Sequence, residues 1–172
     1  IDLDFDIYQK DEKRIIEDVE YVKLIKIICM KLESIVDFDK DTPMVEKINN
    51  FIKIHFHVAI LRKPELVKQE HKKYGSCYKE SFRIRIPGVK INKKLKRYFI
   101  YLLNKDDLLL NELKHVNILN KDVLDADSAT HPIMILGSAK KKSNIAHDFY
   151  KLYKIRYTPI VQEFSCDIDN SF

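Results

Sequence analysis

The first seven residues combine a strand pattern with a cluster of carboxylates. Apolar and acidic residues alternate through residues 1–7, which is the period of a half-buried β-strand. The aspartates Asp2, Asp4 and Asp6 would then share one face, with neighbours roughly 7 Å apart. Such carboxylates repel one another unless water or a cation neutralises them, and Mg²⁺ is often held by one or two carboxylates plus substrate phosphates. The stretch is therefore either a metal platform or an acidic, solvated strand face.

Basic residues further along the chain could bind phosphate. Seven lysines and arginines, and no acid, lie between Arg83 and Arg97. Arg83 and Arg85 alternate with apolar residues, and adjacent guanidinium groups suit anions such as phosphate. After a short apolar stretch, Ser138 and Lys140 lie in a Gly-Ser-Ala-Lys turn, where backbone N–H groups and an ammonium charge could cradle phosphate. The alternative is a lysine-rich composition spread over solvated faces.

Histidine and cysteine offer weaker candidates for a metal site. His55 and His57 share one face of a predicted strand, and His71 and Cys77 lie in a polar segment. Pairs of this kind can ligate zinc, but they are also ordinary strand and loop residues. The sequence leaves their role open.

Length and composition favour one compact domain. The chain has 172 residues, 45% of them hydrophobic, with a net charge of +5, which suits a single sizeable core. No apolar run reaches the length of a membrane helix, so no membrane association is expected. The three cysteines form no CxxC pair, so neither a zinc ribbon nor a disulfide framework is predicted. We expect an intracellular protein.

Periodicity and turn residues predict a mixture of strands and helices. The fold class is α/β (α+β), with a mixed sheet flanked by helices, although the pattern does not predict the strand order. We expect a core over residues 1–157 and a tail or linker over 158–172. Expected strands are 1–7, 51–61, 80–87, 132–136 and 149–155; expected helices are 12–35 (capped by Asp11), 43–49, 91–103 and 108–119; residues 62–78 are expected to form a loop.

Three separated segments together resemble the archaeo-eukaryotic primase superfamily. The acidic strand resembles the first motif, a hydrophobic strand carrying Asp-x-Asp. Residues 79–88, Lys-Glu-Ser-Phe-Arg-Ile-Arg-Ile-Pro-Gly, resemble the second motif strand, and residues 124–128, followed by the Gly-Ser-Ala-Lys turn, resemble the third. The closest likeness is to the primase half of primase–helicases of large nucleocytoplasmic DNA viruses, and it extends from Ile1 to about Ile155.

The resemblance implies a DNA primase or primase–polymerase that works by two-metal nucleotidyl transfer. Asp2, Asp4 and Asp125 would hold Mg²⁺ or Mn²⁺, with Asp127 an alternative to Asp125 and Asp6 a flanking charge. The incoming nucleoside triphosphate would contact Arg83, Ser138 and Lys140. A single-stranded DNA template would lie along a basic stripe with Tyr98 or Tyr101 available for stacking; the stripe comprises Arg85, Lys90, Lys93, Lys94 and Arg97.

Two departures from the superfamily pattern leave other functions open. The second motif normally presents a histidine where this chain has Arg83, which can bind phosphate but cannot titrate near neutral pH. Relatives also have sequence before the first motif, and a helicase domain is an expected partner in the full-length protein. The alternatives are a non-catalytic nucleic-acid-binding module that keeps the primase fold, and another two-metal enzyme such as a nuclease. A viral protein would act in the host cytoplasm or a replication factory.

Overall fold

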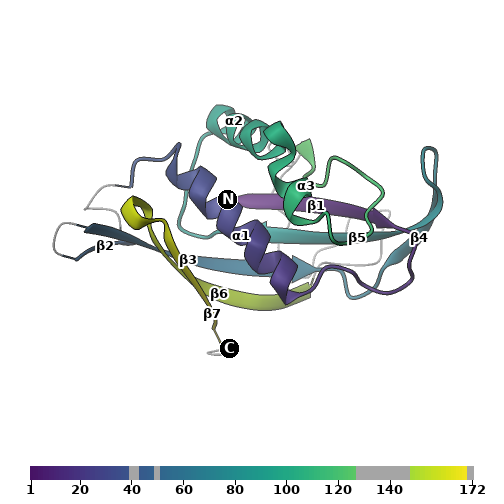
Figure 1. Ribbon diagram of the computed structural model, residues 1–172, viewed down its shortest axis with the longest axis horizontal. Helices are drawn as coiled ribbons and strands as arrows, with labels where there is room; N and C mark the ends of the chain where they lie inside the picture. Colours follow the sequence, from purple (N-terminus) through teal and green to yellow (C-terminus); the bar gives the residue numbers. More distant parts are fainter. Residues whose placement is uncertain (39–42, 49–50, 127–147, 170–172) are drawn as a thin grey trace.

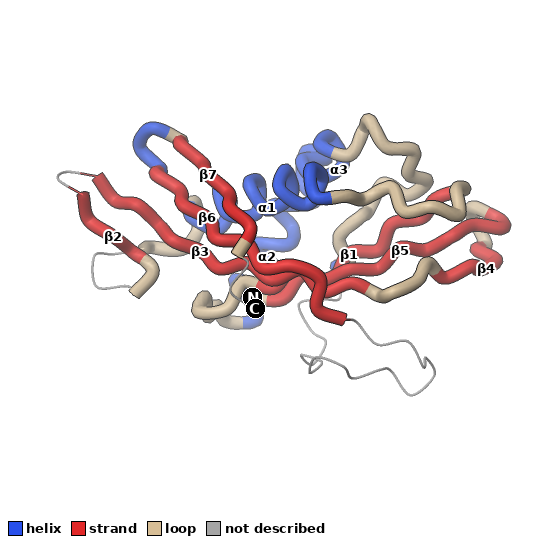
Figure 2. Tube along the Cα trace, turned by 90° about the horizontal axis from the view of Figure 1, so that it is seen from below, coloured by secondary structure: helices blue, strands red, loops and turns tan. Residues whose placement is uncertain are grey.

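Seven antiparallel strands form one sheet in the computed structural model, which describes residues 1–38, 43–48, 51–126 and 148–169. The order is β1-β5-β3-β6-β7, with β2 paired to β3 and β4 paired to β5. In Figure 1, β2 and β4 lie at opposite ends of the sheet, and Figure 2 shows its twist from below. The α+β class is confirmed. The strands are β1 (Asp2–Gln9), β2 (Val45–Ile48), β3 (Phe51–Arg62), β4 (Val67–His71), β5 (Gly75–Arg85), β6 (Asp148–Thr158) and β7 (Glu163–Ile168).

Helices α1 (Asp18–Glu33), α2 (Lys93–Asn104) and α3 (Leu108–Glu112) pack against one another. In Figure 1, α1 crosses the sheet and α2 and α3 lie beside β1. The apolar residues of β1, together with Phe82 of β5, join the buried side of α1 in one core. Phe5 stacks on Phe82 at 4.8 Å between ring centroids, and Tyr21 meets the edge of Phe82 at 5.0 Å. In the described ranges, no helix is both long and apolar enough to cross a membrane.

The predicted long helix begins later than residue 12, so its expected cap at Asp11 is wrong. Helix α1 begins after Glu17, which forms a capping box with Glu20. The preceding segment is held in another way, because Gln9 donates hydrogen bonds to the carbonyls of Asp11 and Lys13.

Two other helix predictions are corrected and one is confirmed. Residues 45–48, expected to be helical, form β2, where Glu46 accepts a hydrogen bond from His55 of β3 at 2.8 Å. The helix expected over 108–119 ends at Glu112, because the following segment instead binds the end of β1, where Leu119 N–H donates to the carbonyl of Tyr8. Helix α2 forms as predicted, with Asn92 capping the N–H of Leu95 at 2.9 Å.

The segment expected to be a loop over residues 62–78 contains a β-hairpin. β4 and the start of β5 pair antiparallel from Val67 with Lys79 to His71 with Gly75. Gly75 has φ +66°, a left-handed conformation that glycine adopts without steric cost. The hairpin extends the sheet beyond the end of β3.

The end of the chain also differs from the expected tail. β7 pairs with β6 from Tyr153 with Ile168 to Thr158 with Glu163, so residues 158–172 contain an edge strand of the same sheet. β3 and β6 include the strands expected over 51–61 and 149–155, and β5 contains residues 80–85 of the strand expected over 80–87. The strand expected over 132–136 and the turn carrying Ser138 and Lys140 lie outside the described residues, as does Asp127.

A buried ion pair ties β5 to the segment before α1. Glu80 is fully buried, and its Oε1 accepts a hydrogen bond from Nη1 of Arg14 at 2.8 Å. Arg14 also donates to the carbonyl of Pro64 at 2.7 Å. Burial raises the pKa of Glu80 above its ordinary value of 4.5, although Arg14 opposes the shift.

We expect Arg14→Met to lower the free energy of unfolding at pH 7 by about 3–5 kcal/mol, because it leaves the Glu80 charge buried without its partner. The loss should shrink as the pH falls, because a raised pKa lets the folded protein take up the proton before the unfolded chain does. Urea unfolding at pH 7 and pH 5 measures both effects. Arg156→Met is the control, since Arg156 and Asp167 form an exposed pair that contributes at most about 1 kcal/mol. Equal losses for the two variants would contradict this account.

Candidate active site

The acidic face of β1 lies directly against the basic face of β5. In the antiparallel register, Asp2 is opposite Arg85 and Asp4 is opposite Arg83. Side chains two residues apart share a face, so this register puts the predicted carboxylates and guanidinium groups together. We call the set Asp2, Asp4, Asp6, Ser81, Arg83 and Arg85 the polar face of β1 and β5.

Each carboxylate on the polar face has a partner on β5. Arg85 Nε donates to Asp2 Oδ1 at 2.5 Å, and Arg83 Nε donates to Asp4 Oδ1 at 2.7 Å. The side chains of Asp2 and Arg83 are only 10% and 8% exposed. Charge-assisted hydrogen bonds strengthen when water is excluded. The acidic cluster predicted from the sequence is therefore neutralised by arginines in this structure.

Asp6 is a flanking charge with partners of its own. Its Oδ1 accepts a hydrogen bond from Ser81 Oγ at 2.7 Å, and its Oδ2 pairs with Lys79 Nζ at 2.7 Å. Burial lowers the pKa of Lys79, but the Asp6 carboxylate outweighs it, so the pKa is raised. Both carboxylate oxygens of Asp6 therefore have partners on β5, a serine and a lysine, whereas the partners of Asp2 and Asp4 are arginines.

Asp125, predicted to supply the third carboxylate, pairs through its backbone with the outer edge of β1. Residues 123–125 pair with this edge: Asp125 N–H donates to the Asp4 carbonyl at 2.9 Å, and Asp6 N–H donates to the Val123 carbonyl at 3.0 Å. β1 is thus hydrogen-bonded on one side to β5 and on the other to this segment. The described parts of the three predicted motif segments therefore meet at β1.

The described side chains form no metal-binding cluster of His, Cys, Asp and Glu. Over the described residues, no group of three or more His, Cys, Asp or Glu side chains is arranged to hold a metal ion. His55 pairs with Glu46, His71 stacks against Tyr74 and Cys77 is buried. The carboxylate oxygens of Asp2 and Asp4 nevertheless suit Mg²⁺ or Mn²⁺ chemically, because hard cations prefer oxygen ligands.

Lys96 is a candidate site residue that the sequence reasoning missed. Burial lowers the pKa of its ammonium group, and the charges of Asp2 and Asp4 act in the opposite direction. Lys96 is therefore partly buried and lies near the carboxylates of the polar face of β1 and β5. In the sequence, Lys96 stands out only as one of several basic residues of a predicted helix. The helical pattern did not show that Lys96 is partly buried while the neighbouring lysines are exposed.

The predicted template stripe occupies two places. Arg85 belongs to the polar face, where it binds Asp2, whereas the other members lie on α2 and the loop before it, at Lys90, Lys93, Lys94 and Arg97, all of them exposed. Tyr98 and Tyr101 are 51% and 57% exposed and stack with centroids 6.3 Å apart. Lys96, on the same helix as Lys93, Lys94 and Arg97, is near enough to Asp2 and Asp4 for their charges to act on it.

The acidic strand β1 lies between the basic strand β5 and the segment that carries Asp125. This arrangement in an antiparallel sheet agrees with the primase class expected from the three motifs. Residues 1–156 match the family described as the C962R protein N-terminal AEP domain, where AEP stands for archaeo-eukaryotic primase. The chain belongs to this family. It is thus an archaeo-eukaryotic primase superfamily member related to viral primase–helicases. A comparison with curated proteins found no match.

Proposed function

We propose that the domain is the catalytic core of a DNA primase or primase–polymerase. The observation that supports this proposal is the meeting of the three motif segments at β1, which brings Asp2 and Asp4 beside two arginines and the backbone of Asp125. Carboxylates and phosphate-binding groups in one place are what nucleotidyl transfer needs. The substrates would be nucleoside triphosphates and a single-stranded DNA template.

Asp2 and Asp4 would hold Mg²⁺ or Mn²⁺, with Asp125 as the third ligand. Their hydrogen bonds to described residues use Oδ1 of each carboxylate, so Oδ2 is the oxygen we assign to the metal. When bound, the metal would stabilise the attacking hydroxyl and the leaving pyrophosphate. Magnesium usually completes its coordination shell with substrate phosphates, so we expect bound nucleotide to strengthen metal binding.

Arg83 and Arg85 would bind the nucleotide phosphates. A guanidinium group donates from several N–H groups at once, so an arginine can keep its carboxylate and still contact a phosphate oxygen. We assign the same role to Ser138 and Lys140. Arg83 cannot move a proton at neutral pH, so its contribution is to bind and orient the triphosphate.

We expect Asp2→Asn/Asp4→Asn to lower metal-dependent nucleotide incorporation by about a hundredfold or more, because both charged metal ligands are lost. The assay uses a single-stranded template with and without a primer, and the exposed Asp11→Asn is the matched control. Incorporation that survives in the double variant would contradict the assignment. Shortening of the substrate instead of extension would indicate a nuclease.

The second candidate function is a non-catalytic nucleic-acid-binding module. The observation that favours it is the Asp4–Arg83 pair, because Arg83 stands where the superfamily motif has a histidine and its positive charge opposes metal binding at Asp4. A wild-type protein that binds single-stranded DNA without incorporating nucleotides would support this candidate over the first.

We assign the template to the exposed face of α2. Helix α2 carries no acidic residue in its first turn and none among residues 93–104, and its exposed tyrosines could stack on bases. We expect Lys93→Glu/Lys94→Glu to weaken single-stranded DNA binding. The slope of log affinity against log salt concentration should become shallower by at least about 1.4 in this variant, since each lost phosphate contact removes about 0.7. Exposed Lys26→Glu on α1 is the control, and an unchanged slope in the double variant would rule out this surface.

A further inference from the structure

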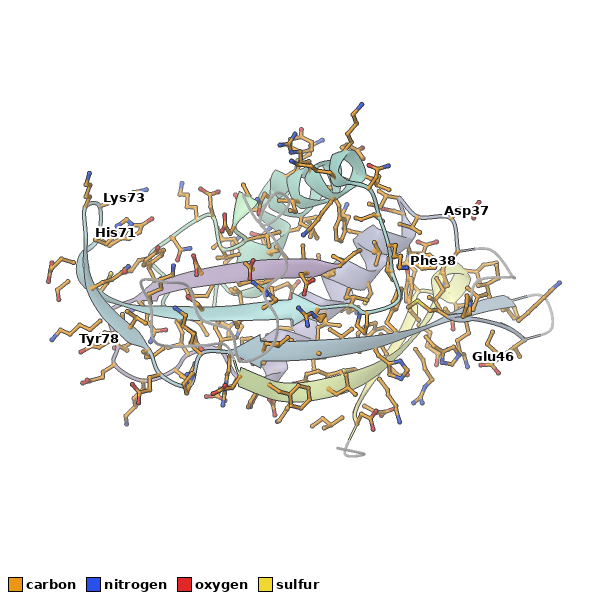
Figure 3. All side chains as sticks on the ribbon, turned by 180° about the vertical axis from the view of Figure 1, so that it is seen from behind. Asp37, Phe38, Glu46, His71, Lys73 and Tyr78 are labelled. Carbon is orange, nitrogen blue, oxygen red and sulfur yellow. The ribbon has the colours of Figure 1, made fainter. Side chains whose placement is uncertain are left out.

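A cluster of aromatic rings lies where β1 meets the β4–β5 hairpin. Tyr8 of β1 lies 4.9 Å from His71, and His71 stacks on Tyr74 at 4.6 Å with an interplanar angle of 15°, measured between ring centroids and ring planes. Tyr8 and Tyr74 are 5.7 Å apart. All three side chains are partly exposed. Figure 3 shows His71 and Lys73 at the end of the molecule opposite Glu46.

The hairpin holds these rings in a fixed arrangement. The His71–Gly75 pair closes the hairpin, and the left-handed conformation of Gly75 lets the chain turn there. The N–H of Lys73 donates to Nδ1 of His71 at 3.2 Å. Just after β1, Lys10 Nζ donates to the carbonyl of Tyr74 at 2.7 Å. The rings are therefore positioned before any ligand arrives.

Lysines surround the cluster. Lys73 Nζ lies 5.3 Å from the Tyr74 ring centroid, and Lys79 Nζ lies 5.7 Å from that of Tyr8. Lys79 is paired with Asp6, but Lys10, Lys72 and Lys73 are exposed. Exposed Glu70 lies on the opposite face of the hairpin, because it directly precedes His71 in β4 and neighbouring strand residues point to opposite faces. Partly exposed rings with exposed cations beside them are the pattern of surfaces that bind single-stranded nucleic acid.

The cluster lies on the same face of the sheet as the candidate site. Tyr8 follows Asp2, Asp4 and Asp6 at alternate positions of β1 and is in register with Lys79. At about 3.3 Å per residue, Tyr8 is about 13 Å from Asp4 along the strand. This distance corresponds to about four base steps of 3.4 Å.

We propose that Tyr8, His71 and Tyr74, with Lys10, Lys72 and Lys73, form a second contact for single-stranded nucleic acid. One or two bases stack on the rings, and the lysines bind the adjacent phosphates. The inference rests on the proposed function, which it deepens by adding a contact beyond the end of the polar face of β1 and β5. It concerns binding alone, so it can be tested apart from catalysis.

The test measures binding of a 16-nucleotide single-stranded DNA by fluorescence anisotropy to the wild-type protein and to His71→Ala/Tyr74→Ala. Base–aromatic stacking contributes about 1–3 kcal/mol per base, so the double variant should bind about 5- to 150-fold more weakly. Tyr78→Ala is the matched control: Tyr78 lies on the same hairpin and is also partly exposed, but it is in register with Lys68, on the face away from His71. Its affinity should change less than twofold.

A second variant tests the lysines without altering the rings. Lys72→Ala/Lys73→Ala should lower the salt slope of binding by about 1.4, at about 0.7 per lost phosphate contact. An RNA of the same sequence should show the same fold-changes, because stacking does not depend on the 2′-hydroxyl. Thermal unfolding of each variant establishes that the hairpin still folds. If a variant unfolds at lower temperature, Tyr74→Leu, which keeps an apolar side chain without an aromatic ring, replaces the double alanine.

Wild-type affinity in the ring variants, or no binding by the wild-type protein, would overturn the inference. Nucleotide incorporation measured on the same preparations separates the two proposals. Loss of binding in the ring variants without any wild-type incorporation would leave the hairpin contact standing and contradict the proposed catalysis. Normal incorporation with unchanged binding in the ring variants would contradict the hairpin contact and leave the proposed catalysis standing.

Discussion

The pairing of Asp2 and Asp4 with Arg85 and Arg83 is the interaction on which the rest of the site depends. It follows from the register between β1 and β5. The same register stacks Phe5 on Phe82 in the core, because neighbouring residues on a strand point to opposite faces. A slip of one residue would turn the aspartates into the core and the phenylalanine out of it. The hydrophobic core therefore determines which charges meet on the other face.

This pairing gives the candidate site a balance of charge that the acidic strand alone lacks. Two carboxylates two residues apart repel, and each guanidinium group relieves part of that repulsion. A divalent metal would have to share the carboxylates with the arginines. In the proposed catalytic cycle, the nucleotide phosphates would give the arginines a second anionic partner. This would explain how one strand face could serve both a metal and arginine side chains.

Local patterns predicted individual strands and helices better than they predicted how those elements are arranged. Alternation identified β1 and β5, and three ordered motifs indicated the superfamily, but neither showed that the two strands are neighbours, because pairing is a long-range property. The hairpin was missed because Val67 is the only apolar residue of β4, so its polar strands carry no hydrophobic period. The helix expected over 108–119 had suitable apolar spacing, but the chain forms turns after Glu112, and residues 118 and 119 then pair with the end of β1.

Binding of Mn²⁺ to the protein without nucleotide, followed by electron paramagnetic resonance, tests most directly whether one set of carboxylates serves both arginines and a metal. The account predicts that Asp2→Asn/Asp4→Asn weakens Mn²⁺ binding by about tenfold or more, because it removes the charged ligands. It also predicts that Arg83→Gln binds Mn²⁺ more tightly than the wild-type protein, because a positive charge beside Asp4 is gone. Mn²⁺ affinity that is the same in all three proteins would contradict the account.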